Sequence, residues 1–208
     1  MFSPYSSLRT GPVRCAWRDY RRGQSAETLL RPWLATELAI DAARIDLSRD
    51  ARGRPQLRVA TDASGDPPTR FDINWSHSGE ALAVALGDGV DVGIDIEWLR
   101  PRPQAMALAR RFFAREEAAA LARLPPDDAE TAFVRLWCAK EAVLKAHGHG
   151  LSFGLDRLTF AAVEGYWSLV ACDPALGRPG DWRLQAFSPL PGYLATLAWR
   201  PRLLQCRP

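Results

Sequence analysis

The sequence predicts an α+β fold made of two halves of similar design. Apolar residues recur at helical spacing in some segments and alternate with polar residues in others, as in helices and half-buried strands. The order of these segments repeats coarsely, because each half contains helical segments followed by short antiparallel strands. Prolines at 101 and 103 mark an extended connector near the middle. We therefore expect an N-terminal half over residues 1–100 and a C-terminal half over residues 101–208, each a small antiparallel sheet packed on helices.

The composition is that of a soluble globular protein, with 47% hydrophobic and 25% charged residues among 208. The net charge of +3 is too small to indicate nucleic-acid binding, but it suits a protein that handles phosphates or an acidic partner. The four cysteines form no C-x-x-C pair, which is typical of reduced thiols and predicts a cytoplasmic location. No apolar run reaches the roughly 18 residues needed to span a bilayer, and the N-terminus lacks signal-peptide features. We expect no membrane partner.

The N-terminal half begins with mixed residues 1–16, where we expect one short strand at most. Residues 25–40 carry an apolar stripe at helical spacing. Ser25 is a candidate N-cap, and Pro32 either kinks this helix or starts it late. A loose basic cluster precedes the helix and is either a solvated turn or a phosphate-binding arm: Arg14, Arg18, Arg21 and Arg22.

A loop-rich region follows, with a short strand expected near residues 56–59. Residues 71–97 then read as an antiparallel meander of three strands. Gly-Asp-Gly at 87–89 is typical of a hairpin turn between the second and third of them. His77 would lie near the mouth of this sheet, not far from the third strand.

The C-terminal half opens with three expected helices and closes with four expected strands. The longest helix follows a Pro-Pro break, and Asp127 and Glu130 have the spacing of a capping box at its start. The adjacent Phe112 and Phe113 are either core residues or part of a partner-binding surface. The expected helices cover residues 104–113, 115–123 and 128–147, and the expected strands cover residues 157–162, 166–171, 182–187 and 193–199.

The third strand of the meander, residues 90–97, carries acidic side chains on one face. Its apolar residues alternate with polar ones, so Asp95 and Glu97 point in the same direction, away from the core. Gly93 lies beside them and leaves room for another element to approach the backbone. Paired carboxylates suit a hard cation such as Mg²⁺, which binds carboxylates together with substrate phosphates. The alternative is an edge strand with a solvated acidic face.

The long helix carries Glu141 and Lys145, which are four residues apart and share a face. As an exposed ion pair they would contribute only ~0.3–0.5 kcal/mol. Trp137 lies one turn before Glu141 on the same line, which favours a partly buried site instead. His147 and His149 at the helix end are more typical of solvated cap residues than of zinc ligands.

Together these positions suit phosphoryl-type chemistry. A divalent cation held by carboxylates can neutralise a diphosphate, while basic groups hold its remaining oxygens. A carboxylate can also draw a proton from an attacking hydroxyl, directly or through water. Spacing alone does not say which group is transferred. The candidates are Asp95, Glu97 and Glu141 as acids, with Lys140, Lys145 and His77 as phosphate-facing bases.

Three motifs in order carry a family resemblance. Residues 71–78, FDINWSHS, are similar to F-N-x-S-H-S, and residues 92–97 read VGIDIE. Residues 137–145, WCAKEAVLK, match W-x-x-K-E-A-x-x-K, and GHGL follows at 148–151. The sequence therefore resembles the Sfp-type 4'-phosphopantetheinyl transferases over most of residues 20–200. Weaker similarities are Gly-Arg-Pro at 53–55 and Arg-Phe-Phe at 111–113.

The resemblance implies a fold of two pseudo-symmetric α+β halves with coenzyme A bound between them. It implies Mg²⁺-dependent transfer of phosphopantetheine from coenzyme A to a serine of an apo acyl or peptidyl carrier protein, releasing adenosine 3',5'-bisphosphate. Fatty-acid, polyketide and peptide-synthetase carriers all stay open. A monomer is plausible, because both sides of the cleft lie in one chain.

The resemblance also implies roles for individual residues. Glu141, or a water that it orients, would help to deprotonate the serine. The segment Arg111 to Phe113 and the following helix would lie towards the carrier protein. By position, Asp95, Glu97 and Glu141 would hold the metal, Lys145 would contact the diphosphate with Lys140 nearby, Ser76 and His77 would contact a coenzyme A phosphate, and Arg54 would lie near the adenine end.

One departure from the family pattern concerns coenzyme A. Glu27 stands where an arginine that grips coenzyme A would align, and Arg21, Arg22 or Arg31 could substitute for it. Two other functions therefore stay as alternatives. One is a non-catalytic protein that binds coenzyme A or a nucleotide. The other is a metal-dependent phosphohydrolase, although such sites usually bring further Asp or His ligands.

Overall fold

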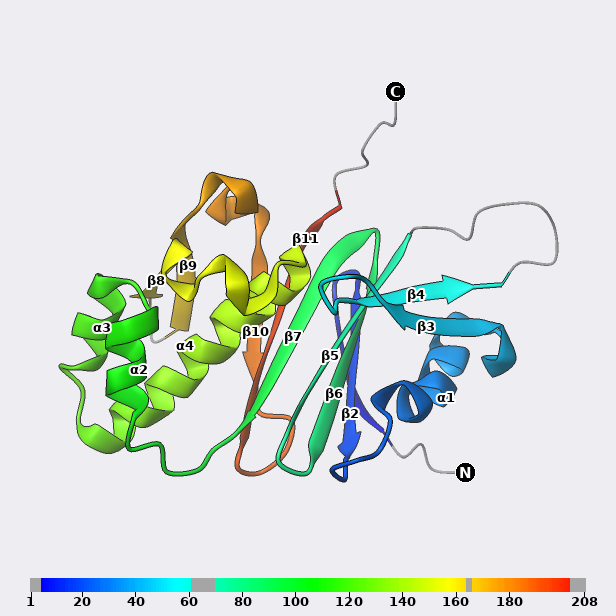
Figure 1. Cartoon of the computed structure of the whole chain (residues 1–208), viewed down its shortest axis with the longest axis horizontal. Coiled ribbons are helices and arrows are strands. Elements are labelled where there is room, and N and C mark those ends of the chain that lie inside the picture. Colours follow the sequence, from blue (N-terminus) through cyan, green and yellow to red (C-terminus); the bar gives the residue numbers. More distant parts are fainter. Residues whose placement is uncertain (1–4, 61–69, 164–165, 203–208) are drawn as a thin grey trace.

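Two antiparallel sheets lie next to each other in the centre of the molecule, and a helix covers the outer side of each (Figure 1). The computed structural model describes residues 5–60, 70–163 and 166–202. The predicted α+β class is confirmed. No helix in these residues is both long enough and apolar enough to cross a membrane.

The first sheet has the strand order β1-β2-β6-β5. Its outer face packs on α1 through one apolar cluster that includes Leu30, Trp33, Ile73 and Trp75. The β3–β4 hairpin lies beside the same helix (Figure 1). The bounds are β1 Ser6–Thr10, β2 Val13–Asp19, α1 Ala26–Leu38, β3 Ile45–Arg49, β4 Pro55–Val59, β5 Phe71–Ser78 and β6 Ala81–Asp88.

Helix α1 starts at the predicted cap. The Ser25 hydroxyl accepts a hydrogen bond from the Thr28 N–H at 3.2 Å. Pro32 lies inside the helix, which continues to Leu38, so the helix does not start late at the proline. It ends at Ala39, whose left-handed φ of 54° closes the last turn.

The second sheet has the order β10-β11-β7, and α4 crosses its outer face. Helices α2 and α3 and the β8–β9 hairpin complete one large apolar cluster around α4. The bounds are β7 Val90–Trp98, α2 Ala105–Phe112, α3 Arg115–Leu121, α4 Pro126–His147, β8 Leu158–Val163, β9 Tyr166–Cys172, β10 Arg183–Phe187 and β11 Tyr193–Pro201.

A third apolar cluster fills the space between the two sheets. The apolar face of β7, Val92 to Ile96, packs there against small residues of β6 such as Ala83 and Ala85. The layers therefore run α1, first sheet, second sheet, α4. The inward face of β7 is apolar as the alternation predicts, and its other face turns towards α4.

The meander expected over residues 71–97 is wrong in its third strand. β5 and β6 pair as a hairpin, but β7 pairs with β11 and not with β6. The glycine turn at 87–89 therefore leads from one sheet to the other. The alternation pattern finds a strand but cannot name its neighbour, because pairing with a strand 100 residues later leaves no local signal.

Two other local predictions were also wrong. Residues 6–19 form the two strands β1 and β2 where one short strand at most is expected. Helix α4 begins at Pro126, with Pro125 as its N-cap, so Asp127 lies inside the helix and makes no capping box. Pro126 suits the first helical position, because the N–H that it lacks has no helical partner there. β3 is an additional strand that the sequence pattern does not reveal.

Gly93 is the point where β7 and α4 come closest. A Cβ on Gly93 would lie 2.0 Å from the Ala142 carbonyl oxygen and 2.5 Å from the Ala146 nitrogen. Both are backbone atoms of α4, so no side-chain movement can relieve the clash. The glycine therefore allows the helix backbone to rest directly on the strand, as its place in the pattern predicts.

We expect Gly93→Ala to lower the free energy of unfolding by about 3 kcal/mol, because the added methyl group overpacks this contact. Urea denaturation followed by circular dichroism measures the change. Gly180→Ala is the matched control, since a Cβ there meets nothing within 4 Å. Equal stability of the two variants would contradict the close packing of α4 on β7.

Candidate active site

Polar side chains of β5 join the two sheets at the edge of β7. Every second residue of β5 turns towards β7, and three of these side chains accept hydrogen bonds from main-chain N–H groups that β11 does not use. Asp72 and Asn74 are buried in this position. The bonds are Val92 N–H to Asp72 Oδ2 at 2.7 Å, Ile94 N–H to Asn74 Oδ1 at 3.3 Å and Trp98 N–H to Ser78 Oγ at 3.1 Å.

Asp95 is the most buried of the predicted acids, with 4% of its surface exposed. Its Oδ1 accepts hydrogen bonds from Ser76 Oγ at 2.9 Å and from Lys145 Nζ at 2.6 Å. Its Oδ2 is buried and has no hydrogen-bond partner among the residues that the structure describes. A buried carboxylate oxygen without a partner is costly, and a cation is one group that can satisfy it.

Glu97 lies two residues further along the same face of β7. Its Oε2 accepts hydrogen bonds from Arg102 Nη2 at 2.6 Å and from Ser78 Oγ at 3.0 Å. Arg102 belongs to the connector between β7 and α2. The sequence pattern predicts this connector but gives no role to Arg102. The alternation that pairs Ser76 with Asp95 also pairs Ser78 with Glu97, so Ser78 could have been found from the pattern.

Glu141 reaches this region from α4 and is also buried. Burial raises its pKa from 4.5 to about 7, and the negative charges of Asp95 and Glu97 add to the rise, while Lys145 opposes it. The predicted acids of β7 and α4 therefore interact electrostatically. Cys138, one turn before Glu141, is a further neighbour, because burial and the charge of Asp95 both raise the pKa of its thiol.

Lys145 connects the two elements directly. Its ammonium donates to Asp95, to Ser76 Oγ at 2.9 Å and to the Ile94 carbonyl at 3.3 Å. Burial lowers its pKa, but the attraction of Asp95 and Glu141 outweighs burial, so the pKa is raised overall. Lys145 is thus a fixed positive charge among the carboxylates, and its side chain is still 25% exposed.

The structure brings Ser76 to the acids but not His77. The two residues are consecutive on β5 and point to opposite faces. The His77 ring is exposed and stacks on Tyr20, with centroids 4.8 Å apart.

Arg54 lies at the C-terminal end of α4. Its guanidinium donates to the Lys145 carbonyl at 2.8 Å, to the Ala146 carbonyl and to the Asp72 carboxylate. A cation at this end of a helix interacts favourably with its unpaired carbonyls. Arg54 therefore holds the turn that carries Lys145.

Lys140 is placed away from the other candidates. Its side chain is fully buried and forms an ion pair with Glu117 at 2.8 Å. It also donates to the Leu155 and Leu158 carbonyls. Burial raises the pKa of Glu117 and lowers that of Lys140, while their mutual attraction opposes both changes. This geometry contradicts a phosphate-facing role for Lys140, because no coenzyme A could reach its ammonium.

The carboxylates are not yet arranged as a metal site. Among the residues that the structure describes, no three His, Cys, Asp or Glu side chains are grouped closely enough to hold a metal ion. Lys145 and Arg102 instead neutralise Asp95 and Glu97. Within the part of the chain that the structure describes, Asp95 Oδ2 is a buried oxygen without a hydrogen-bond partner, and carboxylate oxygens are the ligands that a hard cation prefers, so the donor set fits Mg²⁺.

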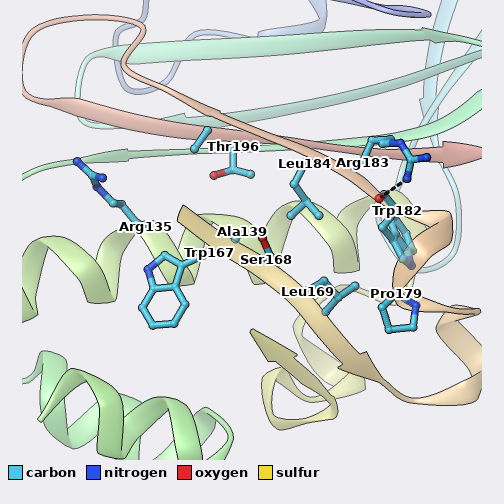
Figure 2. Close-up of a pocket in the computed structure, with 11 residues that line it drawn as sticks. Arg135, Ala139, Trp167, Ser168, Leu169, Pro179, Trp182, Arg183, Leu184 and Thr196 are labelled. Atoms are coloured by element: carbon cyan, nitrogen blue, oxygen red, sulfur yellow. Dashed lines mark hydrogen bonds between the residues drawn. The ribbon is translucent and has the colours of Figure 1, made fainter. Parts of the chain in front are cut away.

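A separate cavity of about 330 Å³ lies between α4, β9, β10 and β11 (Figure 2). Figure 2 shows Trp167, Leu169 and Trp182 along its walls, with Arg135 from α4 at one side. The described residues that line it include no acidic side chain and none of the predicted site residues. It is thus distinct from the carboxylate site.

Glu27 forms an ion pair with Arg49, which the sequence pattern does not predict. Arg49 of β3 donates to its carboxylate at 3.1 Å and lies over the Trp75 ring at 4.7 Å. Arg31, a suggested substitute for the family arginine, donates instead to the Ile45 carbonyl. The positive charge nearest to Glu27 thus comes from β3.

Several known proteins are similar in sequence to this chain. A family model described as the 4'-phosphopantetheinyl transferase superfamily matches residues 91–194. The chain is 30% identical over 188 residues to the 4'-phosphopantetheinyl transferase HetI of Nostoc sp. (strain PCC 7120), covering 88% of this chain and 74% of HetI. This chain belongs to the 4'-phosphopantetheinyl transferase superfamily.

Other family members match a shorter region. The 4'-phosphopantetheinyl transferase psf-1 of Bacillus pumilus is 34% identical over 141 residues, and Sfp of Bacillus subtilis (strain 168) is 31% identical over the same length. These matches cover 68% of this chain but only 56% of psf-1 and 58% of Sfp.

The two phenylalanines before α3 differ in burial, and the partner-binding alternative stays a prediction for Phe112 alone. Phe113 is buried and stacks on Phe133, with ring centroids 5.2 Å apart. Phe112 is 38% exposed, and the Arg111 guanidinium lies 5.0 Å from its ring centroid. One side chain is core, and the other is on the surface.

We expect Lys140→Met to cost about 3–5 kcal/mol in the free energy of unfolding, because Glu117 would be left as an unpaired buried charge. The double variant Lys140→Met/Glu117→Gln removes that charge and should recover a large part of the loss. Chemical denaturation of both variants measures this. A Lys140→Met protein of unchanged stability but weaker coenzyme A binding would restore Lys140 to the phosphate-facing group.

The raised pKa of Glu141 predicts a pH-dependent stability. Between pH 4.5 and about 7 the folded protein keeps a proton on Glu141 that the unfolded chain has lost. The free energy of unfolding should therefore fall as the pH rises through this window, by up to about 3 kcal/mol from this residue.

Glu141→Gln removes this contribution, so the variant should match the wild type near pH 4.5 and be more stable at pH 8. Denaturation curves in EDTA at several pH values test the difference. Parallel pH profiles for the two proteins would show that the proton affinity of Glu141 is ordinary.

Proposed function

We propose that this protein transfers the 4'-phosphopantetheine group of coenzyme A to a serine hydroxyl of an apo acyl or peptidyl carrier protein, releasing adenosine 3',5'-bisphosphate. The observation that carries the proposal is the interaction of Asp95 on β7 with Glu141 and Lys145 on α4. This arrangement occurs in a chain of the 4'-phosphopantetheinyl transferase superfamily. The names of HetI, psf-1 and Sfp support the same reaction.

In this proposal Asp95, Glu97 and Glu141 would hold one Mg²⁺ ion. When bound, the ion would supply Lewis-acid neutralisation of the coenzyme A diphosphate. The chain's own contribution is to place the carboxylates on two elements that pack directly against each other. Asp95 and Glu97 lie on a strand that β5 and β11 hold on both sides, and Glu141 lies on a helix that rests on Gly93.

Two side chains have proposed roles in the reaction itself. Glu141 would accept the proton of the attacking serine hydroxyl, directly or through a water, as a carboxylate within reach of the hydroxyl can. The serine oxygen bonds to the phosphorus that carries pantetheine, and the bond from that phosphorus to the leaving nucleotide oxygen breaks. Lys145 would hold diphosphate oxygens by charge-assisted hydrogen bonds.

Other residues predicted to contact coenzyme A are Ser76, His77 and Arg54, and the structure supports them unequally. Ser76 lies within hydrogen-bond distance of both Asp95 and Lys145, which supports a place near the diphosphate. His77 faces the other side of β5, so a contact with coenzyme A would have to come over the end of that strand. Arg54 would act mainly by fixing the turn of α4 that carries Lys145.

Mass spectrometry of the carrier protein tests the proposal. The protein is mixed with coenzyme A, Mg²⁺ and an apo carrier protein, and the carrier should gain one phosphopantetheine group. Tight coenzyme A binding with an unchanged carrier would favour a binding protein. Hydrolysed coenzyme A with an unchanged carrier would favour a phosphohydrolase.

We expect Asp95→Ala and Glu141→Ala each to lower the transfer rate at least 100-fold while the protein stays folded, because each removes a proposed metal ligand. Asp46→Ala is the matched control, since Asp46 is an exposed aspartate on β3. Initial rates at saturating Mg²⁺ measure the effect. Normal turnover by either site variant would remove the metal model.

A further inference from the structure

Arg102 forms an ion pair with Glu97, which is one of the proposed metal ligands. Its Nη2 lies 2.6 Å from Glu97 Oε2, and both side chains are only 20% exposed. A partly buried ion pair is less screened than one on the surface. A positive charge at this distance opposes the approach of any second cation to Glu97.

Only some of the hydrogen-bond donors of the Arg102 guanidinium have good partners. Its Nε is buried and has no hydrogen-bond partner in residues 5–60, 70–163 and 166–202, and its second Nη2 contact, to the Trp98 carbonyl, is long at 3.5 Å. An unsatisfied buried donor reduces the net stability of the contact. Moving the guanidinium away from Glu97 therefore costs less free energy than the short ion pair alone suggests.

A second position is available beside it. Arg102 also lines a groove of about 320 Å³ between the connector, α2, α3 and the start of α4. Glu130 lines the same groove, and its Oε2 accepts the Arg102 backbone N–H at 3.0 Å. The Glu130 carboxylate thus lies where a released guanidinium could pair with it while the backbone stays in place.

We propose that Arg102 is an internal counter-cation of Glu97, which lowers the affinity of the site for divalent cations and moves towards Glu130 when the site is loaded. The proposal rests on the proposed function, because it takes Glu97 as a metal ligand. Arg102 touches no reacting atom in it and acts through Glu97, so it is a positioning residue. Its consequence is a site that fills at a higher metal concentration than its carboxylates alone would require.

Binding of Mn²⁺, which replaces Mg²⁺ and is visible by electron paramagnetic resonance, tests this inference without measuring turnover. The full chain is titrated with MnCl₂ at saturating coenzyme A, and a coenzyme A solution without protein serves as the blank. We expect Arg102→Gln to bind Mn²⁺ about tenfold more tightly than the wild type. Arg102→Lys keeps the charge and should stay within about threefold of the wild type.

Arg100→Gln is the matched control. Arg100 belongs to the same connector and is exposed, and its guanidinium lies 6.0 Å from the Trp98 ring centroid. The variant removes the same charge without touching Glu97, so its Mn²⁺ affinity should change less than twofold. Circular dichroism spectra check that all three variants are folded.

The outcomes separate the two proposals. Wild-type protein that binds Mn²⁺ as tightly as Arg102→Gln does would overturn the counter-cation role and leave the metal centre standing. Weaker binding by Arg102→Gln would overturn it too, since Arg102 would then hold Glu97 ready for the metal. No Mn²⁺ binding by wild type or variants would overturn the metal centre itself, and the role of Arg102 with it.

Discussion

Along one edge of β7, side chains instead of a neighbouring strand accept the hydrogen bonds of the main-chain N–H groups. The rest of the structure depends on these bonds. Asp72, Asn74 and Ser78 of β5 bond the free N–H groups of β7. Ordinary strand pairing would have placed backbone beside this edge. Side-chain acceptors leave room for Ser76 of β5 and Lys145 of α4 to reach Asp95. The same contacts thus join the two sheets and bring polar groups to the acids.

The acids of the site consequently lie on closely packed elements, and their charges are balanced by long cationic side chains. α4 rests on Gly93 backbone to backbone, and β7 is bonded along both edges, so neither element can shift independently. The charges of the acids are met by long, flexible side chains, Lys145 and Arg102. Such an arrangement keeps the oxygens in place and lets the cations exchange, which suits a site that must accept and release a highly charged substrate.

Much of this could be predicted from the sequence, and the failures have definite causes. Periodicity located α1, α4 and the strand that carries Asp95 and Glu97, since each has a strong one-sided pattern. It could not foresee that β7 pairs with β11, because register between distant strands leaves no local mark. Lys140 was misplaced, since a buried lysine and a phosphate-binding lysine look the same in one dimension. Arg102 lay in a proline-rich connector where no pattern applies.

The pairing of β7 with β11 also determines where this chain could be divided into two fragments without separating paired strands. Breaking it in the connector after Trp98 would separate the strand that bears both acids from the sheet that holds it. Breaking it at Gly89 would leave every strand from β7 to β11 with its sheet neighbours. The region matched by the family model, residues 91–194, begins within β7 and ends within β11, so it too includes most of β7 with the sheet formed by β10 and β11.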